Sequence, residues 1–128
     1  MKANILIVDD EANTLASLSR AFRLAGYEAT ICDSAARALE LVKTQQFDLI
    51  FSDVVMPEKD GLQVCRELRE RTSTRSIPVV CVSISDDLCP RALELGAAQY
   101  IRKPVDASTL LDAVRSACAG VAGQPVRR

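Results

Sequence analysis

Short apolar runs that alternate with stretches of helical periodicity constrain this chain more than any other feature of its sequence. Four largely apolar runs of four to six residues, and a weaker fifth, lie at 4–8, 29–32, 48–52, 77–82 and 98–102. Runs this short and rich in branched side chains are typical of strands that are buried on both faces of a parallel sheet. Between the runs, apolar residues recur every three or four positions, which predicts helices.

Capping residues indicate where the predicted helices begin and end. Ser34 and Asp106 are of the type that caps helix N-termini, while Gly26 and Gly96 follow helical segments as C-terminal caps. Pro90 is tolerated only at the start of a helix, so the helix before the last strand is predicted to be short, late or irregular. Five strands alternating with five helices predict one parallel sheet covered on both faces, because right-handed crossovers place the helices there.

Length and cysteine content indicate a single domain that folds without disulfide or metal staples. The chain has 128 residues, 48% apolar and 26% charged; at this length folding buries about two-thirds of the unfolded surface. Its five cysteines are an odd number without a Cys-x-x-Cys pair, so we interpret them as core residues in a reducing cytoplasm. We expect the domain to span residues 4–118, with 119–128 as a C-terminal tail or the start of a linker.

Charge, hydropathy and the lack of histidine exclude several classes of function. A net charge of −1 gives no global attraction to nucleic acid or to an anionic membrane, so we expect no direct nucleic-acid binding by this domain. No apolar run approaches about 18 residues, and acidic residues come too early for a signal peptide, so we expect a cytoplasmic protein without a membrane span. The absence of histidine removes His-based triads, imidazole bases and His metal sites.

Polar side chains follow four of the predicted strands at the points where those strands end. In an open doubly wound sheet, ligands bind at the carboxyl ends of the strands, so these residues are the candidate site. Carboxylates brought together there would repel one another, and a divalent cation with oxygen ligands relieves this repulsion. Mg²⁺ fits best, because the set offers hard oxygen ligands and no Cys or His. The residues are Asp9, Asp10, Ser52, Asp53, Ser83 and Lys103.

Each of these residues also has a purely structural interpretation when it is considered alone. Asp9 or Asp10 could cap the helix that follows, Asp53 could begin a turn, and Lys103 could be a solvated loop residue. Unrelated capping does not explain why all of them fall at one edge of the predicted sheet. Their joint placement therefore favours a functional site.

Four motifs in this order resemble the receiver domains of two-component response regulators, and the resemblance covers residues 4–118. It implies a (βα)5 flavodoxin-like receiver fold, that is, a doubly wound five-stranded parallel sheet with helices on both faces. The motifs are Ile-Val-Asp-Asp-Glu at 7–11, Ser-Asp-Val-Val-Met-Pro at 52–57 with Asp60-Gly61, Ser83, and Tyr-Ile-Arg-Lys-Pro at 100–104.

The resemblance assigns the chemistry of phosphorylation to five positions. It implies that Asp53 accepts the phosphoryl group and that Asp10, Asp53 and the carbonyl of Val55 hold Mg²⁺, with Asp9 assisting through water. It also implies that Lys103 contacts the phosphoryl oxygens. Phosphoryl transfer depends mainly on positioning and charge neutralisation, which Mg²⁺ and an ammonium group supply.

The resemblance also implies a conformational switch and a set of partners. Ser83 would contact the phosphoryl group, and its movement would let Tyr100 rotate from exposed to buried. The donor would be a separate histidine kinase or phosphotransfer protein, because this chain has no histidine. The output would be an effector domain or partner protein on the face of the fourth helix, fifth strand and fifth helix, and we also expect a homodimer on phosphorylation.

The chain departs from the family pattern at Ile84 and in the stretch from Ser83 to Gly96, which looks shorter than usual. Ile84 follows Ser83 where the family usually has a small residue, and we expect it to act as a gate that slows phosphoryl groups and water at Asp53. A receiver is not an enzyme beyond its own phosphorylation and dephosphorylation. One rival function is a Mg²⁺-dependent aspartyl-phosphate hydrolase, but this chain has Val55 where such an enzyme would have a second catalytic Asp. The other is a flavodoxin-like cofactor binder, but this chain has no phosphate-binding loop after the first strand.

Overall fold

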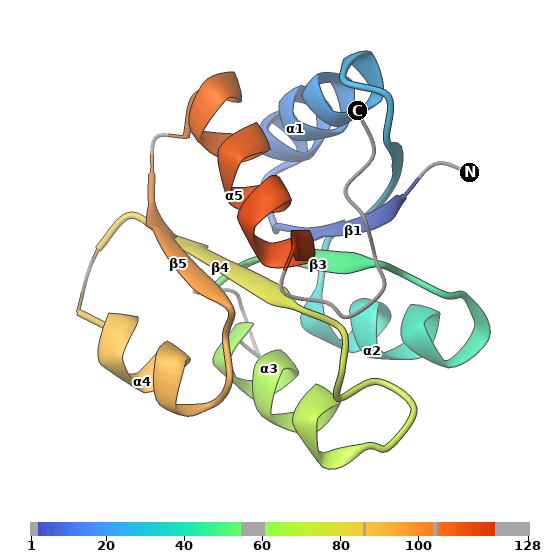
Figure 1. Cartoon of the computed structure of the whole chain (residues 1–128), viewed down its shortest axis with the longest axis vertical. Helices are drawn as coiled ribbons and strands as arrows, with labels where there is room; N and C mark the ends of the chain where they lie inside the picture. Colours follow the sequence, from blue (N-terminus) through green and yellow to red (C-terminus); the bar gives the residue numbers. More distant parts are fainter. Residues whose placement is uncertain (1–2, 55–60, 86, 104, 120–128) are drawn as a thin grey trace.

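A computed structural model describes residues 3–54, 61–85, 87–103 and 105–119 of the chain. Strands and helices alternate along this part, as the sequence predicts, and form a three-layered molecule (Figure 1). The strands are β1 (Asn4–Val8), β2 (Glu28–Cys32), β3 (Leu49–Asp53), β4 (Val79–Ser83) and β5 (Gln99–Arg102). The helices are α1 (Ala12–Leu24), α2 (Ala35–Thr44), α3 (Gly61–Glu70), α4 (Cys89–Glu94) and α5 (Ala107–Ala119).

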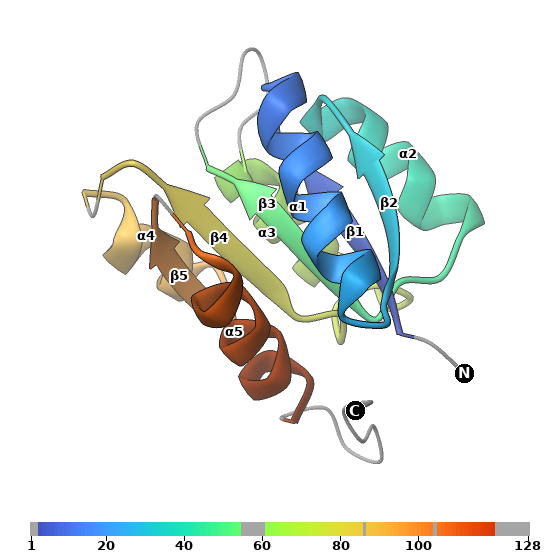
Figure 2. The ribbon, with the colours of Figure 1, turned by 90° about the horizontal axis from the view of Figure 1, so that it is seen from above.

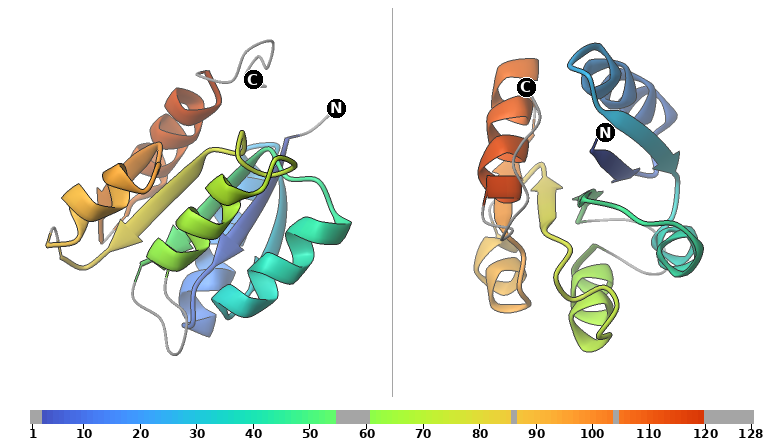
Figure 3. Two further views of the ribbon diagram at one scale, coloured as in Figure 1. Left: turned by 90° about the horizontal axis from the view of Figure 1, so that it is seen from below. Right: turned by 45° about the vertical axis from the view of Figure 1, so that its right-hand side comes forward.

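The five strands form one parallel sheet in the order β2-β1-β3-β4-β5. Figure 2 looks onto the face that carries α1 and α5, and the left view of Figure 3 looks onto the face that carries α2, α3 and α4. The strand order reverses between β1 and β3, and in such sheets ligands bind outside the carboxyl ends of the strands at that point. The predicted doubly wound fold is therefore confirmed.

Two apolar clusters, one on each face of the sheet, hold the layers together. Leu6 and Val8 of β1 belong to the cluster under α2, α3 and α4, whereas Ile5 and Ile7 belong to the cluster under α1 and α5. Alternate residues of a strand point to opposite faces, which explains why the central strands are apolar throughout. The four described cysteines are all free thiols, and Cys32, Cys65 and Cys81 are buried, as predicted for core residues.

Helix ends follow the capping signals in the sequence. The Ser34 hydroxyl accepts a hydrogen bond from the Arg37 amide at 3.1 Å, and the Asp106 carboxylate accepts one from the Thr109 amide at 2.8 Å. Gly26 and Gly96 adopt positive φ angles of 96° and 102°, which residues with a Cβ rarely adopt.

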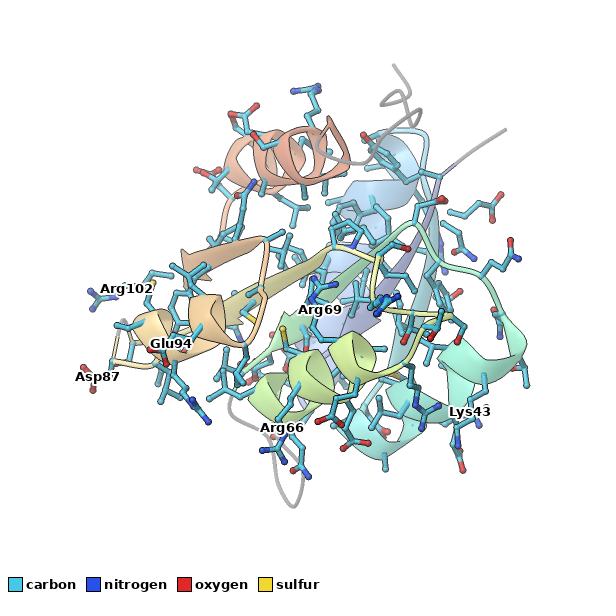
Figure 4. The ribbon with its side chains drawn as sticks, turned by 60° about the horizontal axis from the view of Figure 1, so that its bottom comes forward. Lys43, Arg66, Arg69, Asp87, Glu94 and Arg102 are labelled. Carbon is cyan, nitrogen blue, oxygen red and sulfur yellow. The ribbon has the colours of Figure 1, made fainter. Side chains whose placement is uncertain are left out.

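The segment from β4 to β5 contains one correction and one confirmation. The strand predicted at 77–82 begins instead at Val79, because the Ile77 amide donates to the Thr74 carbonyl inside a turn. Helix α4 has only six residues and carries Pro90 in its first turn, as predicted. Arg69 of α3 donates from Nε and Nη2 to the Gly96 carbonyl at 3.2 and 2.7 Å and so ties α3 to the turn after α4 (Figure 4).

No helix in the described ranges is long and apolar enough to cross a membrane. The tail predicted at 119–128 lies outside these ranges from residue 120 onward, and the domain boundary at 118 remains a prediction.

Candidate functional site

Three carboxylates meet where β1 and β3 end. Val8 of β1 lies opposite Ser52 of β3 in the parallel register, so the residues that follow them are brought to one edge. Asp9 is 2% exposed and Asp53 is 8% exposed, whereas Asp10 is exposed at the rim. One ligand oxygen from each of these three residues lies within 4.8 Å of the other two. The structure thus brings together the three acids that the sequence predicted.

Lys103 joins this acidic cluster from the end of β5. Its Nζ lies 3.1 Å from Oδ2 of Asp9 and 3.6 Å from Oδ2 of Asp53, and its backbone amide donates to the Ser83 carbonyl at 2.7 Å. Burial lowers the pKa of the Lys103 ammonium, but the hydrogen bond to Asp9 and the charge of Asp53 outweigh burial and raise this pKa above its ordinary value. Lys103 therefore stays charged beside the acids.

The charge balance and the donor atoms of the cluster fit a divalent cation. Among the described residues, the three carboxylates of the cluster outnumber the single ammonium group of Lys103 beside them. All the ligand atoms on offer are hard oxygens, the kind that Mg²⁺ prefers. In Asp9, Oδ1 accepts a hydrogen bond from the Glu11 amide at 2.9 Å and Oδ2 is paired with Lys103. Because both of its carboxylate oxygens already have partners, Asp9 is less suited than Asp10 to bind a cation directly.

Ser83 and Tyr100 are linked through the backbone of one residue between the fourth strand and the fourth helix. The Ser85 amide donates to the Ser83 hydroxyl at 3.3 Å, and the Tyr100 hydroxyl donates to the Ser85 carbonyl at 2.6 Å. Ser83 is buried, while Tyr100 is half-buried and packs against the cluster under α2, α3 and α4. Sequence reasoning selected both side chains but missed the part that Ser85 plays, for which its place two residues after Ser83 is the only signal.

A cavity of about 500 Å³ opens beside the acids on the α1 side of the sheet. Ile84 forms part of its rim and is 74% exposed, so it stands next to the site as predicted but is not buried in it. The other walls of this cavity carry no motif that marks them in the sequence. Its lining comprises Val8, Asp9, Asn13, Thr14, Ser17, Leu18, Phe51, Asp53, Val82, Ile84, Lys103 and Val105.

Part of the predicted site lies outside the described residues. Val55, whose carbonyl is a predicted Mg²⁺ ligand, falls in the segment 55–60, as does most of the loop that follows Asp53. Its role remains a prediction. Ser52, the remaining polar residue at these strand ends, is fully buried and its hydroxyl donates to the Asp53 carbonyl at 3.0 Å, so it supports the strand end.

Comparison with known proteins shows similarity to response regulator receiver domains over nearly the whole chain. The sequence pattern of the response regulator receiver domain matches residues 5–115. Response regulator MprA of Mycobacterium sp. (strain KMS) is 33% identical over 118 residues, which cover 91% of this chain and 50% of that protein. Response regulator PleD of Caulobacter vibrioides (strain NA1000 / CB15N) is 36% identical over 91% of this chain but only 26% of PleD. The chain thus spans half or less of these relatives.

Solved structures agree with the sequence comparison. The signal receiver domain of a signal transduction histidine kinase from Syntrophus aciditrophicus has a TM-score of 0.87 and 32% identity, covering 98% of this chain and 97% of that one. The chemotaxis protein CheY4 of Vibrio cholerae has a TM-score of 0.86 and 26% identity, covering 91% of this chain and 99% of that one. The chain belongs to the response regulator receiver domain family, the phosphorylatable switches of two-component signalling.

Proposed function

We propose that Asp53 is the phosphoryl acceptor of this receiver domain. The observation that carries this proposal is the convergence of Asp9, Asp10, Asp53 and Lys103 in one cluster that opens into a cavity. Asp53 combines three properties that an acceptor needs: a position at a strand end, a charged partner in Lys103, and access from the cavity. The family match favours this switch over the hydrolase and the cofactor binder that the sequence left open.

In the proposed transfer, an Asp53 carboxylate oxygen forms a bond to the donor's phosphorus as the bond from phosphorus to the donor's imidazole nitrogen breaks. Lys103 lies where it can pair with the phosphoryl oxygens, and Asp10 and Asp53 would hold Mg²⁺, with Asp9 assisting through water and the Val55 carbonyl as a further ligand. The bound ion supplies positive charge to the transferred group. Self-catalysed phosphorylation and dephosphorylation are the only chemistry we assign to the domain.

The proposed response to phosphorylation runs from Ser83 to Tyr100. A new phosphoryl group adds acceptor oxygens and negative charge, and the Ser83 hydroxyl can turn to donate to it. The Ser83 hydroxyl accepts a hydrogen bond from the Ser85 amide, so its rotation would break this bond and free the backbone at Ser85 to move. The Ser85 carbonyl in turn holds the Tyr100 hydroxyl. Tyr100 is thereby coupled to the state of Asp53 through two hydrogen bonds.

The partners follow from this role. We propose a histidine kinase or phosphotransfer protein as donor, and an output through the surface of α4, β5 and α5 toward an effector domain, a partner protein or a second copy of the chain. The relatives MprA and PleD carry sequence beyond the matched region, which supports an effector domain. The four described free thiols suit the reducing cytoplasm in which we place the protein.

Intact-mass measurement after incubation with Mg²⁺ and an acyl phosphate tests the acceptor. We expect one phosphoryl group on the wild type and none on Asp53→Asn. Asp33→Asn is the matched control, because Asp33 is an exposed aspartate that directly follows β2 at the same edge of the sheet. Stoichiometric labelling of Asp53→Asn at the wild-type rate would refute the proposal.

A further inference from the structure

The cavity beside the acids is lined by both charged and apolar residues. Asp9, Asp53 and Lys103 supply the charged groups, and Phe51 and Val82 of the sheet supply apolar side chains. Leu18 of α1 and Val105, in the loop before α5, extend the apolar lining. A volume of about 500 Å³ is in the range of small-molecule sites, roughly 300–1,000 Å³.

The cavity is larger and its lining more apolar than a phosphoryl group alone requires. A phosphoryl group bound near Asp53 and Lys103 engages only the charged part of the lining, and the remainder is apolar with a few neutral hydrogen-bonding groups on α1, namely Asn13, Thr14 and Ser17. A matching ligand therefore carries a phosphoryl group at one end and an uncharged, largely apolar body at the other. Acyl phosphates with an extended acyl group have this composition.

We propose that the cavity binds acyl phosphates with extended apolar acyl groups and makes them better direct phosphodonors than those with short acyl groups. This inference rests on the proposed function of Asp53. An Asp53 carboxylate oxygen would bond to phosphorus while the bond from phosphorus to the acyl oxygen breaks, and the electron pair leaves with the acyl group as a carboxylate. The acyl chain lies against Leu18 and Val105 during transfer.

The size of the preference follows from the area that the cavity removes from water. Burying one methylene group favours binding about threefold to fourfold. Butyryl phosphate has two methylenes more than acetyl phosphate, so its half-saturating concentration for labelling Asp53 is about tenfold lower. Charge does not distinguish the two donors, because both present the same phosphoryl group to Lys103 and the acids. The comparison therefore isolates the apolar part of the cavity.

Labelling of the full chain with acetyl phosphate and butyryl phosphate at saturating Mg²⁺, followed by intact mass, tests the preference. We expect the tenfold difference in half-saturating concentration. Phosphoramidate, which has no acyl group, serves as a reference donor. If no donor labels Asp53, the proposed function itself is wrong; if the two acyl phosphates label Asp53 at the same half-saturating concentration, only the present inference is wrong.

A matched pair of leucine variants on one helix locates the effect. Leu18 lines the cavity, whereas Leu24 is 79% exposed at the other end of α1. The quantity compared is the half-saturating concentration of acetyl phosphate divided by that of butyryl phosphate. Leu18→Ala is expected to reduce this ratio about threefold, and Leu24→Ala to keep the wild-type ratio. Equal ratios in both variants would overturn the assignment of the acyl group to this cavity.

Binding can also be measured without transfer. A phosphonate analogue of butyryl phosphate, with a methylene group in place of the bridging oxygen, cannot pass its phosphorus to Asp53. Added together with Mg²⁺, it should shift the methyl NMR signals of Leu18 and Val105 and leave those of Leu24 in place. Unshifted Leu18 and Val105 signals at concentrations that perturb Asp53 would contradict the proposal.

Discussion

The two faces of the sheet differ in how completely their helices cover it. Under α2, α3 and α4 the apolar cluster is continuous and includes fully buried side chains such as Leu68, Cys65 and Cys81. On the other face, a cavity beside α1 extends down to Phe51 and Val82 of the sheet and reaches the acids. A cavity of about 260 Å³ on the first face lies between α3 and α4 and has no sheet residue in its lining. We therefore call the first face closed and the second face open.

This difference separates the entry of the phosphoryl group from the response to it. Asp53 and Lys103 are reached through the cavity on the open face. Tyr100 packs against the cluster of the closed face and hydrogen-bonds to Ser85 at the start of the loop toward α4. We infer that the phosphodonor approaches on the open face and that side-chain packing changes on the closed face. The ends of β3, β4 and β5 connect the two.

The largest expected effect separates the two faces functionally. Lys103→Ala removes the ammonium group that would pair with the phosphoryl oxygens and thereby stabilise the conformation of the phosphorylated domain. We expect this variant to keep part of its labelling at Asp53 but to lose most of the remote response. Amide NMR spectra with and without beryllofluoride measure this response. A full wild-type set of shifts around Tyr100 and α4 in Lys103→Ala would show that the two faces are not coupled through Lys103.

A matched pair of core variants tests whether the faces really differ in packing. Leu68 is 0% exposed in the closed cluster, whereas Leu18 is partly buried at the wall of the cavity. We expect Leu68→Ala to lower the free energy of unfolding by about 3 kcal/mol, because it leaves an enclosed void. Leu18→Ala should cost less than about 1 kcal/mol, since water can already reach its site. Urea unfolding measures both, and equal losses would mean that the open face is packed as tightly as the closed one.

Removing one acid from the open edge should weaken metal binding and strengthen the fold. Asp10→Ala deletes an oxygen ligand and one negative charge from the cluster, so we expect the affinity for Mg²⁺ to fall about a hundredfold. In the absence of metal the same change relieves repulsion among the acids, so the variant should unfold at a slightly higher temperature. Asp33→Ala, at an exposed aspartate outside the cluster, is the control. Wild-type Mg²⁺ affinity in Asp10→Ala would exclude Asp10 as a ligand.

The closed face was easier to predict from sequence than the open one. Apolar periodicity between the third and fourth apolar runs predicted a helix, and the structure has α3 there, because burial in a continuous layer depends on local pattern alone. Strand ends likewise predicted Asp9 and Asp53, since parallel strands carry their C-terminal residues to one edge. Both predictions need only the order of the elements.

The features that the sequence did not reveal depend on the relative placement of distant elements. The cavity is lined by residues of α1, β3, β4 and the segment after β5, and no local pattern shows how such distant elements are spaced. The hydrogen bond from Tyr100 to the Ser85 carbonyl involves a backbone group, which sequence patterns do not identify. The late start of β4 at Val79 has a different, local cause, since the Ile77 amide donates to the Thr74 carbonyl in a turn that apolar periodicity does not indicate.

The smallest expected effect concerns the rim of the cavity at Ile84. Ile84 lines the cavity together with Asp53, yet it is 74% exposed, so it borders both the cavity and the solvent. Hydrolysis of an acyl phosphate needs a water held in line with the leaving carboxylate, and an apolar side chain at the rim cannot hold one. Alanine cannot hold such a water either, so the variant differs only in bulk: with a smaller side chain at the rim, we expect Ile84→Ala to speed both labelling by acetyl phosphate and spontaneous loss of phosphate, by a factor on the order of ten, or ~1.4 kcal/mol of barrier.

Leu93→Ala is the natural comparison for Ile84→Ala, because Leu93 is also an exposed apolar residue but lies on α4, on the closed face and away from the cavity. Stopped-flow labelling and the decay of the phosphorylated form, followed by mass, should change in Ile84→Ala and stay constant in Leu93→Ala. Acceleration in both variants would point to a general loosening of the loop between β4 and α4. Unchanged rates in Ile84→Ala would mean that its side chain turns away from Asp53 in solution, and the open face would then owe its access to α1 and Val105 alone.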